Sequence, residues 1–270
     1  GEEVYYIGHL QQDLYGQRII DEFAEAGVDT SQVVFSDDMI TPLASVLVNR
    51  LTGSRTIITR KMQTPPSLTY EQKLKLDDLA ERLIASEEPV TILIDGHEAE
   101  ISEYLIKKLP NARVVMDGGS LRASNIKLAA WTDYFVVSEH FARDYMSYRS
   151  LSTEAEIKAA LIELNKICRG EAFITLGEKG CAFLKSGMLQ IVPSWLCNAV
   201  DTTGAGDVFH GAFTYGVHYS WHIDNIILFA SLTAAISIEK KGVRESMPDL
   251  AVVHHSLNSY ERNLTQYFEE

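Results

Sequence analysis

The sequence predicts an α/β fold with a mostly parallel central sheet, and three observations support this. Strand-like and helix-like segments alternate along most of the 270 residues, as they do where crossover helices join parallel strands. Two short apolar runs, Val90–Ile94 and Arg113–Met116, each lead into an aspartate and are typical of buried parallel strands. Hydrophobic residues make up 46% of the chain, enough for the core of one large α/β domain.

The first elements are a strand and a helix. Val4–Ile7 has the pattern of a strand, and Gly16–Ala26 has the pattern of a helix with one apolar face. Gly27 follows directly, in the place where a glycine commonly ends a helix in the left-handed conformation.

A hairpin outside the main sheet is expected at about residues 40–61. Leu43–Arg50 and Arg55–Arg60 are rich in β-branched residues and flank the turn-like stretch Leu51-Thr52-Gly53-Ser54. An ordinary edge hairpin would explain this pattern equally well. Pro65-Pro66 marks the return to the main domain, with a helix from about Tyr70.

The remaining elements follow in alternation. Further strands are expected at Tyr134–Val137 and Ala172–Leu176, and further helices at Ala99–Lys108, Thr153–Cys168, Asp207–Tyr219 and Asp224–Glu239.

Composition excludes several classes of function. The formal net charge of −13 argues against nucleic acid or an anionic membrane surface as a partner. The three cysteines have no metal-ligand spacing and are expected to be free thiols. No apolar stretch is long enough to span a bilayer and the acidic N-terminus is unlike a signal peptide, so the cytoplasm is the expected location.

The run Asp201-Thr202-Thr203-Gly204-Ala205-Gly206-Asp207-Val208-Phe209 carries the clearest chemistry. A loop of small residues that opens a helix directs backbone N–H groups and the positive end of the helix dipole at one point, which favours an anion. Asp207 falls in the first helical turn beside that point. A base next to an anion site is what phosphoryl transfer to a hydroxyl requires.

This run resembles the C-terminal signature of the PfkB, or ribokinase-like, carbohydrate kinases, and the extension His210-Gly211-Ala212-Phe213 is similar to ketohexokinase-like and sulfofructose kinase-like members. The resemblance implies one three-layer α/β/α domain over residues 1–270, with the hairpin as a small β-lid. It implies an ATP-dependent sugar kinase in which Asp207 is the base, in contact with the sugar hydroxyl, and Gly204, Ala205 and Gly206 hold the transferred phosphate.

Other contacts are carried over from the resemblance. Thr175-Leu176-Gly177-Glu178-Lys179-Gly180 matches a turn that lies against the nucleotide, whereas Glu178 and Lys179 are expected in solvent. The predicted nucleotide-binding residues are Thr175, Gly177, Gly180, Arg55, Ser138 and Ser231. Gly96 and His97 fall near the sugar, although a histidine at a strand end is often only a hydrogen-bonded loop residue. Asp117 falls near the phosphates, or else caps a turn.

The resemblance also implies metal ions. Members that bind potassium use the loop after the last helix and the start of the signature, which in this sequence are Asp201, Thr203, Ser237, Lys240, Gly242 and Ser246. Magnesium is expected with ATP. The family's Asn-x-x-Glu is replaced here by Ser138-Glu139-His140-Phe141, so Mg²⁺ is expected to be held mainly by water and phosphate oxygens.

The chain also lacks the family's first strand, with its sugar-binding aspartate, and the Gly-Gly segment that follows. Either the sequence omits an N-terminal piece or the protein lacks half of the usual sugar site. A protein without the first strand would have an uncovered sheet edge, so we expect that an N-terminal piece is omitted from the sequence.

The resulting hypothesis is transfer of the γ-phosphate of ATP to a keto-sugar or furanose hydroxyl, by a homodimer paired through the β-lid, with no nucleic acid or membrane partner. The alternatives are a kinase that acts on a sugar acid, a sulfosugar or a nucleoside, and a non-catalytic sugar- or nucleotide-binding sensor or scaffold of the same fold.

Overall fold

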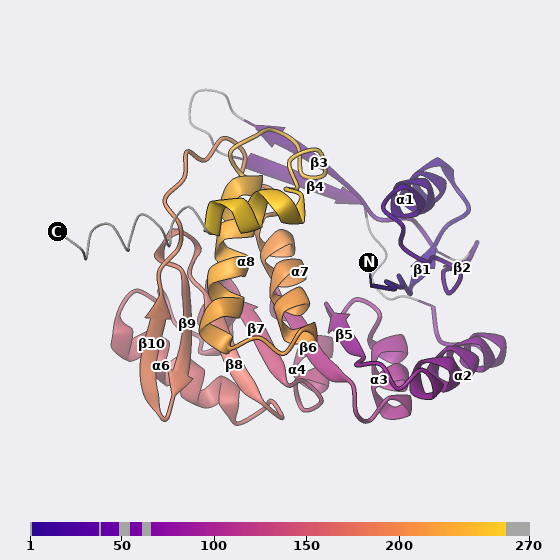
Figure 1. Ribbon diagram of the computed structural model, residues 1–270, viewed down its shortest axis with the longest axis horizontal. Coiled ribbons are helices and arrows are strands. Elements are labelled where there is room, and N and C mark those ends of the chain that lie inside the picture. The colour runs from indigo at the N-terminus through magenta and orange to yellow at the C-terminus, as the bar shows by residue number, and fades with distance from the viewer. Residues whose placement is uncertain (1, 38, 49–54, 61–65, 258–270) are drawn as a thin grey trace. The chain divides into compact units, whose positions relative to one another are not determined.

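The computed structural model describes residues 2–37, 39–48, 55–60 and 66–257 (Figure 1). The chain divides into two compact units. The N-terminal unit consists of residues 1–88 and 97–109, and the C-terminal unit consists of residues 89–96 and 110–270.

A mostly parallel sheet forms the centre of the C-terminal unit (Figure 1). Among the described residues its strand order is β10-β9-β8-β7-β6-β5, in which β5 to β8 are parallel and β9 and β10 are antiparallel additions. The strands are β5 (Thr91–Ile94), β6 (Arg113–Gly118), β7 (Tyr134–Ser138), β8 (Glu171–Thr175), β9 (Cys181–Lys185) and β10 (Met188–Val192).

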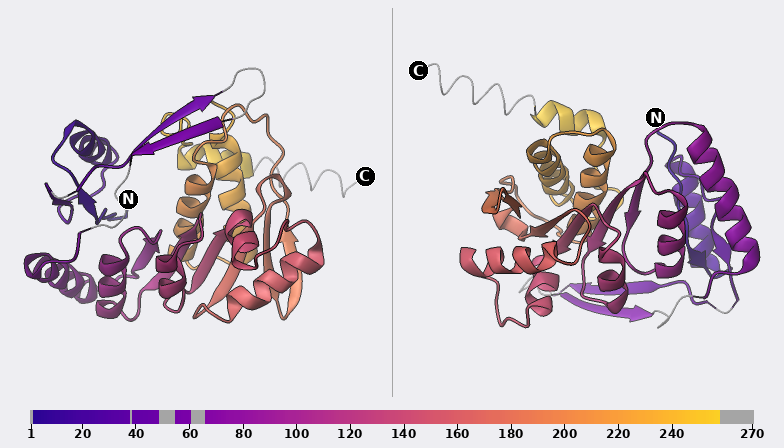
Figure 2. Two further views of the ribbon diagram at one scale, coloured as in Figure 1. Left: turned by 180° about the vertical axis from the view of Figure 1, so that it is seen from behind. Right: turned by 90° about the horizontal axis from the view of Figure 1, so that it is seen from below.

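Helices cover both faces of this sheet (Figure 2). One face carries α5 (Glu139–Tyr145) and α6 (Glu154–Asn165), and the other carries α7 (Ala205–His218) and α8 (Ile223–Ser237). The short helix α4 (Ala123–Ala129) connects β6 to β7, and a 3-10 turn, η1 (Gly177–Lys179), connects β8 to β9. This layering is the predicted α/β arrangement.

Apolar side chains between the sheet and α7–α8 form the core of this unit. Phe213 is fully buried, and its ring meets the rings of Tyr134, Phe173 and Phe209 at centroid separations of 5.3 to 6.0 Å. Aromatic contacts of this kind add to the free energy gained by burying the rings. Phe213 therefore joins α7 to β7 and β8, the strands whose ends carry the predicted site.

The N-terminal unit contains two small sheets and three helices within its described residues. Strands β1 (His9–Leu10) and β2 (Val34–Phe35) are parallel, and β3 (Leu43–Val48) and β4 (Arg55–Arg60) form an antiparallel pair. The helices are α1 (Leu14–Glu25), α2 (Tyr70–Ala85) and α3 (Ala99–Lys108). The hairpin predicted outside the main sheet is thus confirmed.

A buried polar network links three segments of this unit. The His9 ring is 2% exposed, its Nδ1 lies 3.0 Å from a Glu98 carboxylate oxygen, and its Nε2 lies 2.8 Å from the Gln72 amide nitrogen. The Glu98 carboxylate also accepts a bond from the His9 main-chain N–H. β1, the start of α2 and the start of α3 are therefore held together by hydrogen bonds.

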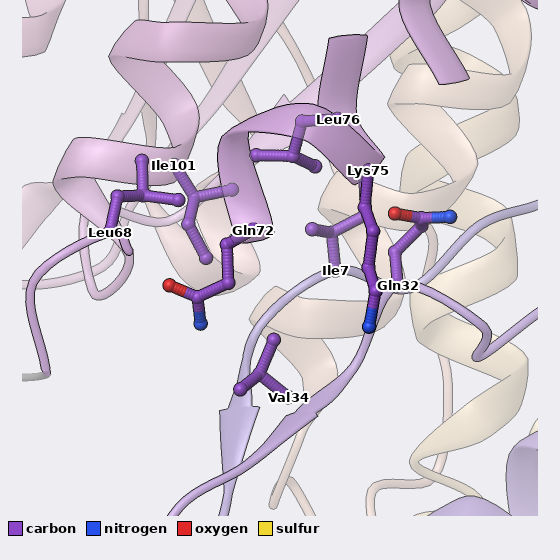
Figure 3. Close-up of a pocket in the computed structure, with 8 residues that line it drawn as sticks. All are labelled: Ile7, Gln32, Val34, Leu68, Gln72, Lys75, Leu76 and Ile101. Carbon is purple, nitrogen blue, oxygen red and sulfur yellow. The ribbon is translucent and has the colours of Figure 1, made fainter. Parts of the chain in front are cut away.

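A shallow hollow lies beside this network (Figure 3). It is lined by the aliphatic side chains of Ile7, Val34, Leu68, Leu76 and Ile101 together with Gln32, Gln72 and Lys75. None of the residues predicted for the active site lines it.

Most predicted elements have their observed positions within one to three residues, and two differ. The strand predicted at Val4–Ile7 is wrong: Tyr5 makes only an isolated bridge to Asp29, and the ladder with Val34–Phe35 forms at His9–Leu10. The β9–β10 hairpin was not predicted. Its turn uses positive φ at Ser186 (52°) and Gly187 (76°), as a tight hairpin turn requires.

Three further expectations concern the end of α1, the cysteines and helix length. Gly27 has φ of +74° just after α1, which confirms the helix end. Cys168, Cys181 and Cys197 are free thiols. Among the described residues, no helix has the length and apolar content that crossing a membrane would require.

Replacing Phe213 by alanine should lower the free energy of unfolding by about 3–5 kcal/mol, because it leaves a cavity between α7 and the sheet. Urea denaturation followed by circular dichroism measures this. Leu196→Ala, at a side chain that is fully exposed, is the matched control and should change stability very little. Equal stability of both variants would contradict the placement of Phe213 in the core.

Candidate active site

The parallel strands of the C-terminal unit bring several polar residues to one edge of the sheet. Asp117 is the next-to-last residue of β6, Ser138 is the last residue of β7, and Thr175 is the last residue of β8. Because the carboxyl ends of parallel strands meet at the same edge, these side chains share one side of the sheet, where α/β proteins bind ligands.

Helix α7 begins at a glycine that no other residue could replace without strain. Gly204, its N-cap, has φ of +76° and a left-handed conformation. A Cβ atom at this position would overlap Cγ1 of Val243. The start of α7 is therefore fixed by backbone geometry, and its first N–H groups point outward along the helix axis, where they favour an anion.

Gly206 differs from Gly204. A Cβ atom built on Gly206 would meet no protein atom within 4 Å, and the residue is exposed in the first turn of α7. Alanine is a better helix former than glycine, so the protein's own packing gives no reason for glycine here. The small residue leaves space above the first turn of the helix.

The Asp207 carboxylate has a raised pKa. Desolvation by surrounding protein is the largest cause, followed by the negative charge of Asp117; the nearby His210 ring lowers the pKa and Asp95 raises it further. Asp207 nevertheless remains exposed to solvent. Asp207 is thus surrounded by protein mass yet open on one side, an arrangement that suits a base awaiting a substrate proton.

His210 joins three elements around this carboxylate. Its ring is 3% exposed. Nδ1 lies 2.7 Å from the Gly206 carbonyl oxygen and 3.3 Å from Asp117 Oδ2, and Nε2 lies 3.2 Å from the Val136 carbonyl oxygen of β7. The first turn of α7 is therefore linked through one side chain to β6 and β7.

The loop before α7 is tied to the segment after α8. One carboxylate oxygen of Asp201 accepts bonds from the Thr203 N–H (3.1 Å) and hydroxyl (2.7 Å), and the other accepts a long bond from the Gly242 N–H (3.4 Å). The Asp201 N–H donates to the carbonyl of Ile238 at 3.1 Å. The buried Ser246 hydroxyl donates to the Gly242 carbonyl.

The turn between β8 and β9 is also fixed by glycine. Gly177 has φ of +60° and Gly180 has φ of +101°, and a Cβ atom on Gly180 would overlap the Val192 carbonyl oxygen. The Thr175 hydroxyl lies 3.4 Å from the Val137 carbonyl oxygen. Glu178 and Lys179 are both exposed, as predicted. This turn follows the strand next to β7, at the same edge of the sheet.

Comparisons with known proteins show the family of this chain. Residues 1–250 match the model of the pfkB family carbohydrate kinases. The chain belongs to the pfkB family. Its members are phosphotransferases that act on sugar hydroxyls, so this chain is a carbohydrate kinase.

Individual relatives share limited identity over nearly the whole chain. A ribokinase of Lactococcus lactis is 27% identical over 262 residues, which cover 97% of this chain and 82% of that protein. Fructokinase-2 of Oryza sativa is 22% identical over 271 residues, covering 94% and 79%. The structure of Giardia lamblia ribokinase matches with a TM-score of 0.78 at 20% identity, covering 95% and 82% of the two chains.

The predicted site residues of this pfkB kinase lie in four groups. Those in the signature, Gly204 to Asp207, lie together at the start of α7. Of the predicted potassium ligands, Thr203 and Gly242 donate hydrogen bonds to Asp201, and Ser246 donates to Gly242. Ser237 is the last residue of α8, and its hydroxyl donates to the Ala234 carbonyl. Lys240 is exposed.

Other predicted residues have structural partners of their own. The Ser138 hydroxyl caps α5, accepting from the Phe141 N–H at 3.0 Å, and donates to the Gly119 carbonyl at 2.9 Å. Ser231 is buried in α8. Gly96 has φ of +78° and lies against Asn125, whose amide bonds the Asp95 carbonyl at 3.4 Å. Their contacts with ligands stay predictions.

Two predicted residues belong to the N-terminal unit. His97 is exposed at its border. Arg55 is the first residue of β4, and its side chain lies outside the described residues. Their contact with sugar or ATP, and pairing of two copies through the β3–β4 hairpin, also stay predictions.

Sequence reasoning did not single out the ring of His210. A histidine between apolar residues in a helix has the pattern of a core residue, and only the position of the Val136 carbonyl on β7 reveals its second contact.

Alanine replacements of three glycines should distinguish a glycine that the protein's own packing requires from a glycine that leaves room for a ligand. Gly204→Ala should lower the free energy of unfolding by about 1–3 kcal/mol because of its positive φ and the overlap with Val243. Gly206→Ala should raise it by about 0.5–1 kcal/mol yet slow phosphoryl transfer about 10²-fold, because a methyl group displaces the transferred phosphate.

The matched control is Gly211→Ala, also in α7 and also with no protein atom within 4 Å of a built Cβ. It should gain stability without losing activity. Urea denaturation and steady-state kinetics measure both quantities; full activity in Gly206→Ala would show that no ligand uses the space above that residue.

Proposed function

We propose that this chain is an ATP-dependent sugar kinase that phosphorylates a hydroxyl of a furanose or keto-sugar. Asp207 accepts the proton of that hydroxyl, and the oxygen then attacks the γ-phosphorus of ATP in line. The observation that carries the proposal is the position of Asp207, partly desolvated yet accessible, in the first turn of a helix that opens with Gly204.

The relatives support the choice of substrates. A matching structure is that of Arabidopsis thaliana ribokinase complexed with ribose and ATP, with a TM-score of 0.76, and another is a Xylella fastidiosa fructokinase with bound ATP, with a TM-score of 0.73. A ribokinase, a fructokinase and a deoxyribokinase are among the related sequences. Pentoses and ketohexoses in furanose form, with a free primary hydroxyl, are therefore the first substrates to test.

Each part of the site has a task in this mechanism. The outward N–H groups of the first turn of α7, with the helix dipole, stabilise the negative charge of the transferred phosphate. In this proposal, the Thr175–Gly180 turn contacts the nucleotide. Partial desolvation raises the proton affinity of Asp207 and so makes it a stronger base than a solvated carboxylate.

Magnesium is proposed to arrive with the nucleotide. Among the described residues, no group of three or more His, Cys, Asp or Glu side chains is arranged to hold a metal ion. We therefore assign no protein side chain to it, and its ligands would be phosphate oxygens and water. When bound, it neutralises charge on the phosphates.

Asp207→Asn should reduce kcat by about 10²–10⁴-fold, because the amide cannot accept the proton. The folded-state pKa is raised, so the native protein retains this proton to a higher pH than the unfolded chain. The ionised form therefore costs stability as pH rises from about 3.9 through the native pKa.

The variant should consequently melt at a higher temperature than the parent at neutral pH, with the difference vanishing in acid. A coupled ADP-release assay and thermal melts at several pH values test both statements. A near-normal kcat in the variant would remove Asp207 as the base.

Potassium is proposed to bind between the Asp201 loop and the segment after α8. Carbonyl and hydroxyl oxygens of Asp201, Thr203, Ser237, Lys240, Gly242 and Ser246 would hold it, and it would fix the loop before α7. The bonds that already join Asp201, Thr203, Gly242 and Ser246 support this location.

At constant ionic strength, replacing Na⁺ by K⁺ should increase kcat/KM several-fold, and Ser246→Ala should weaken this dependence while the fold is retained. Identical rates in the two salts would contradict the potassium site. Steady-state kinetics in chloride salts provides the measurement.

A further inference from the structure

Both nitrogens of the buried His210 ring face hydrogen-bond acceptors. Nδ1 lies 2.7 Å from the Gly206 carbonyl oxygen and 3.3 Å from a carboxylate oxygen of Asp117. Nε2 lies 3.2 Å from the Val136 carbonyl oxygen. A carbonyl oxygen can only accept, so each nitrogen must carry a hydrogen to make these bonds.

A neutral imidazole has only one N–H group. In that form, one ring nitrogen would present a lone pair to a carbonyl oxygen in a site that is 3% exposed, where an unmade hydrogen bond is costly. The imidazolium form satisfies both contacts. Its positive charge is compensated by the Asp117 carboxylate at 3.3 Å.

We infer that His210 is a positioning residue that acts as an imidazolium. Its hydrogen bonds and charge hold the first turn of α7 against β6 and β7, and its positive charge favours the ionised form of the base Asp207. This inference rests on the proposed function of Asp207. His210 itself does not touch the reacting atoms. It acts through the Gly206 carbonyl, which is one residue from Asp207, and through its charge.

The charges around Asp207 show why such a cation is needed. Asp117 from β6 and Asp95 from the end of β5 both raise the pKa of Asp207, and desolvation raises it more than either. His210, on the same helix as Asp207, acts in the opposite direction. Without it, two carboxylates and the loss of solvent would all favour protonated Asp207, which cannot accept a proton from the sugar.

The test uses His210→Gln, which keeps an N–H donor but carries no charge. Its kcat/KM should rise with pH along an acidic limb displaced upward by about one pH unit, since Asp207 ionises later without the cation. KM for the sugar should change less than kcat. His218→Gln is the matched control: His218 also lies on α7, with its ring 3.3 Å from the Thr91 hydroxyl, and its replacement should leave the limb in place.

A second measurement does not depend on activity. In protein labelled with ¹⁵N-histidine, the signals of one of the eight histidines should disappear in His210→Gln, which assigns them. At neutral pH both ring nitrogens of that residue should have the shifts of protonated nitrogens. The charge is then read on the parent protein, so the result does not depend on the activity of the variant.

Two outcomes would overturn the inference: a ring nitrogen of His210 without a proton, or an unmoved acidic limb in folded His210→Gln. Failure of the proposed function is recognised separately. Full activity of Asp207→Asn would show that Asp207 is not the base, whereas the ¹⁵N shifts of His210 are measured on the parent protein and do not depend on that result.

Discussion

The first turn of α7 must be held at one place against the carboxyl ends of the parallel strands, and the proposed chemistry depends on this. Three contacts hold it. Gly204 reverses the chain in a conformation with φ of +76° and packs on Val243, the Asp201 carboxylate joins the preceding loop to Gly242, and His210 reaches back to β6 and β7. A helix start with fewer restraints would let its N–H groups and its carboxylate move apart.

The same turn is a place where stability is given up for function. Like charges at Asp207, Asp117 and Asp95 oppose one another, and desolvation adds to the cost of ionising Asp207. Gly206 also lowers stability, because a glycine in a helix loses more backbone entropy on folding than an alanine. The protein would have room for a Cβ atom at this position. Both features are unfavourable for folding, and both leave a charged, open point above the helix, which the proposed binding of a phosphate group would explain.

The amino-acid sequence predicted the parts of this structure that local rules control. The helix that starts near Asp207, the hairpin at Leu43–Arg60 and the parallel strands β5 to β8 of the main sheet follow from apolar periodicity, small residues and turn signals. The position of β1 did not follow, because its ladder depends on which residues lie opposite Val34 and Phe35. The contacts of His210 were also beyond prediction, since they depend on a main-chain carbonyl 74 positions away.

The thiol of Cys181 can report when strands β8 and β9, which flank the Thr175–Gly180 turn, separate. Cys181 is fully buried opposite Thr175 in the β8–β9 ladder, and burial raises the pKa of its thiol to about 12. A thiol in this state reacts with alkylating reagents only when the ladder separates. Cys168 and Cys197 are less buried and would react earlier. The rate at which the last thiol is modified therefore measures how often these strands part, and its slowing by a nucleotide would show that the ligand closes them, without any introduced label.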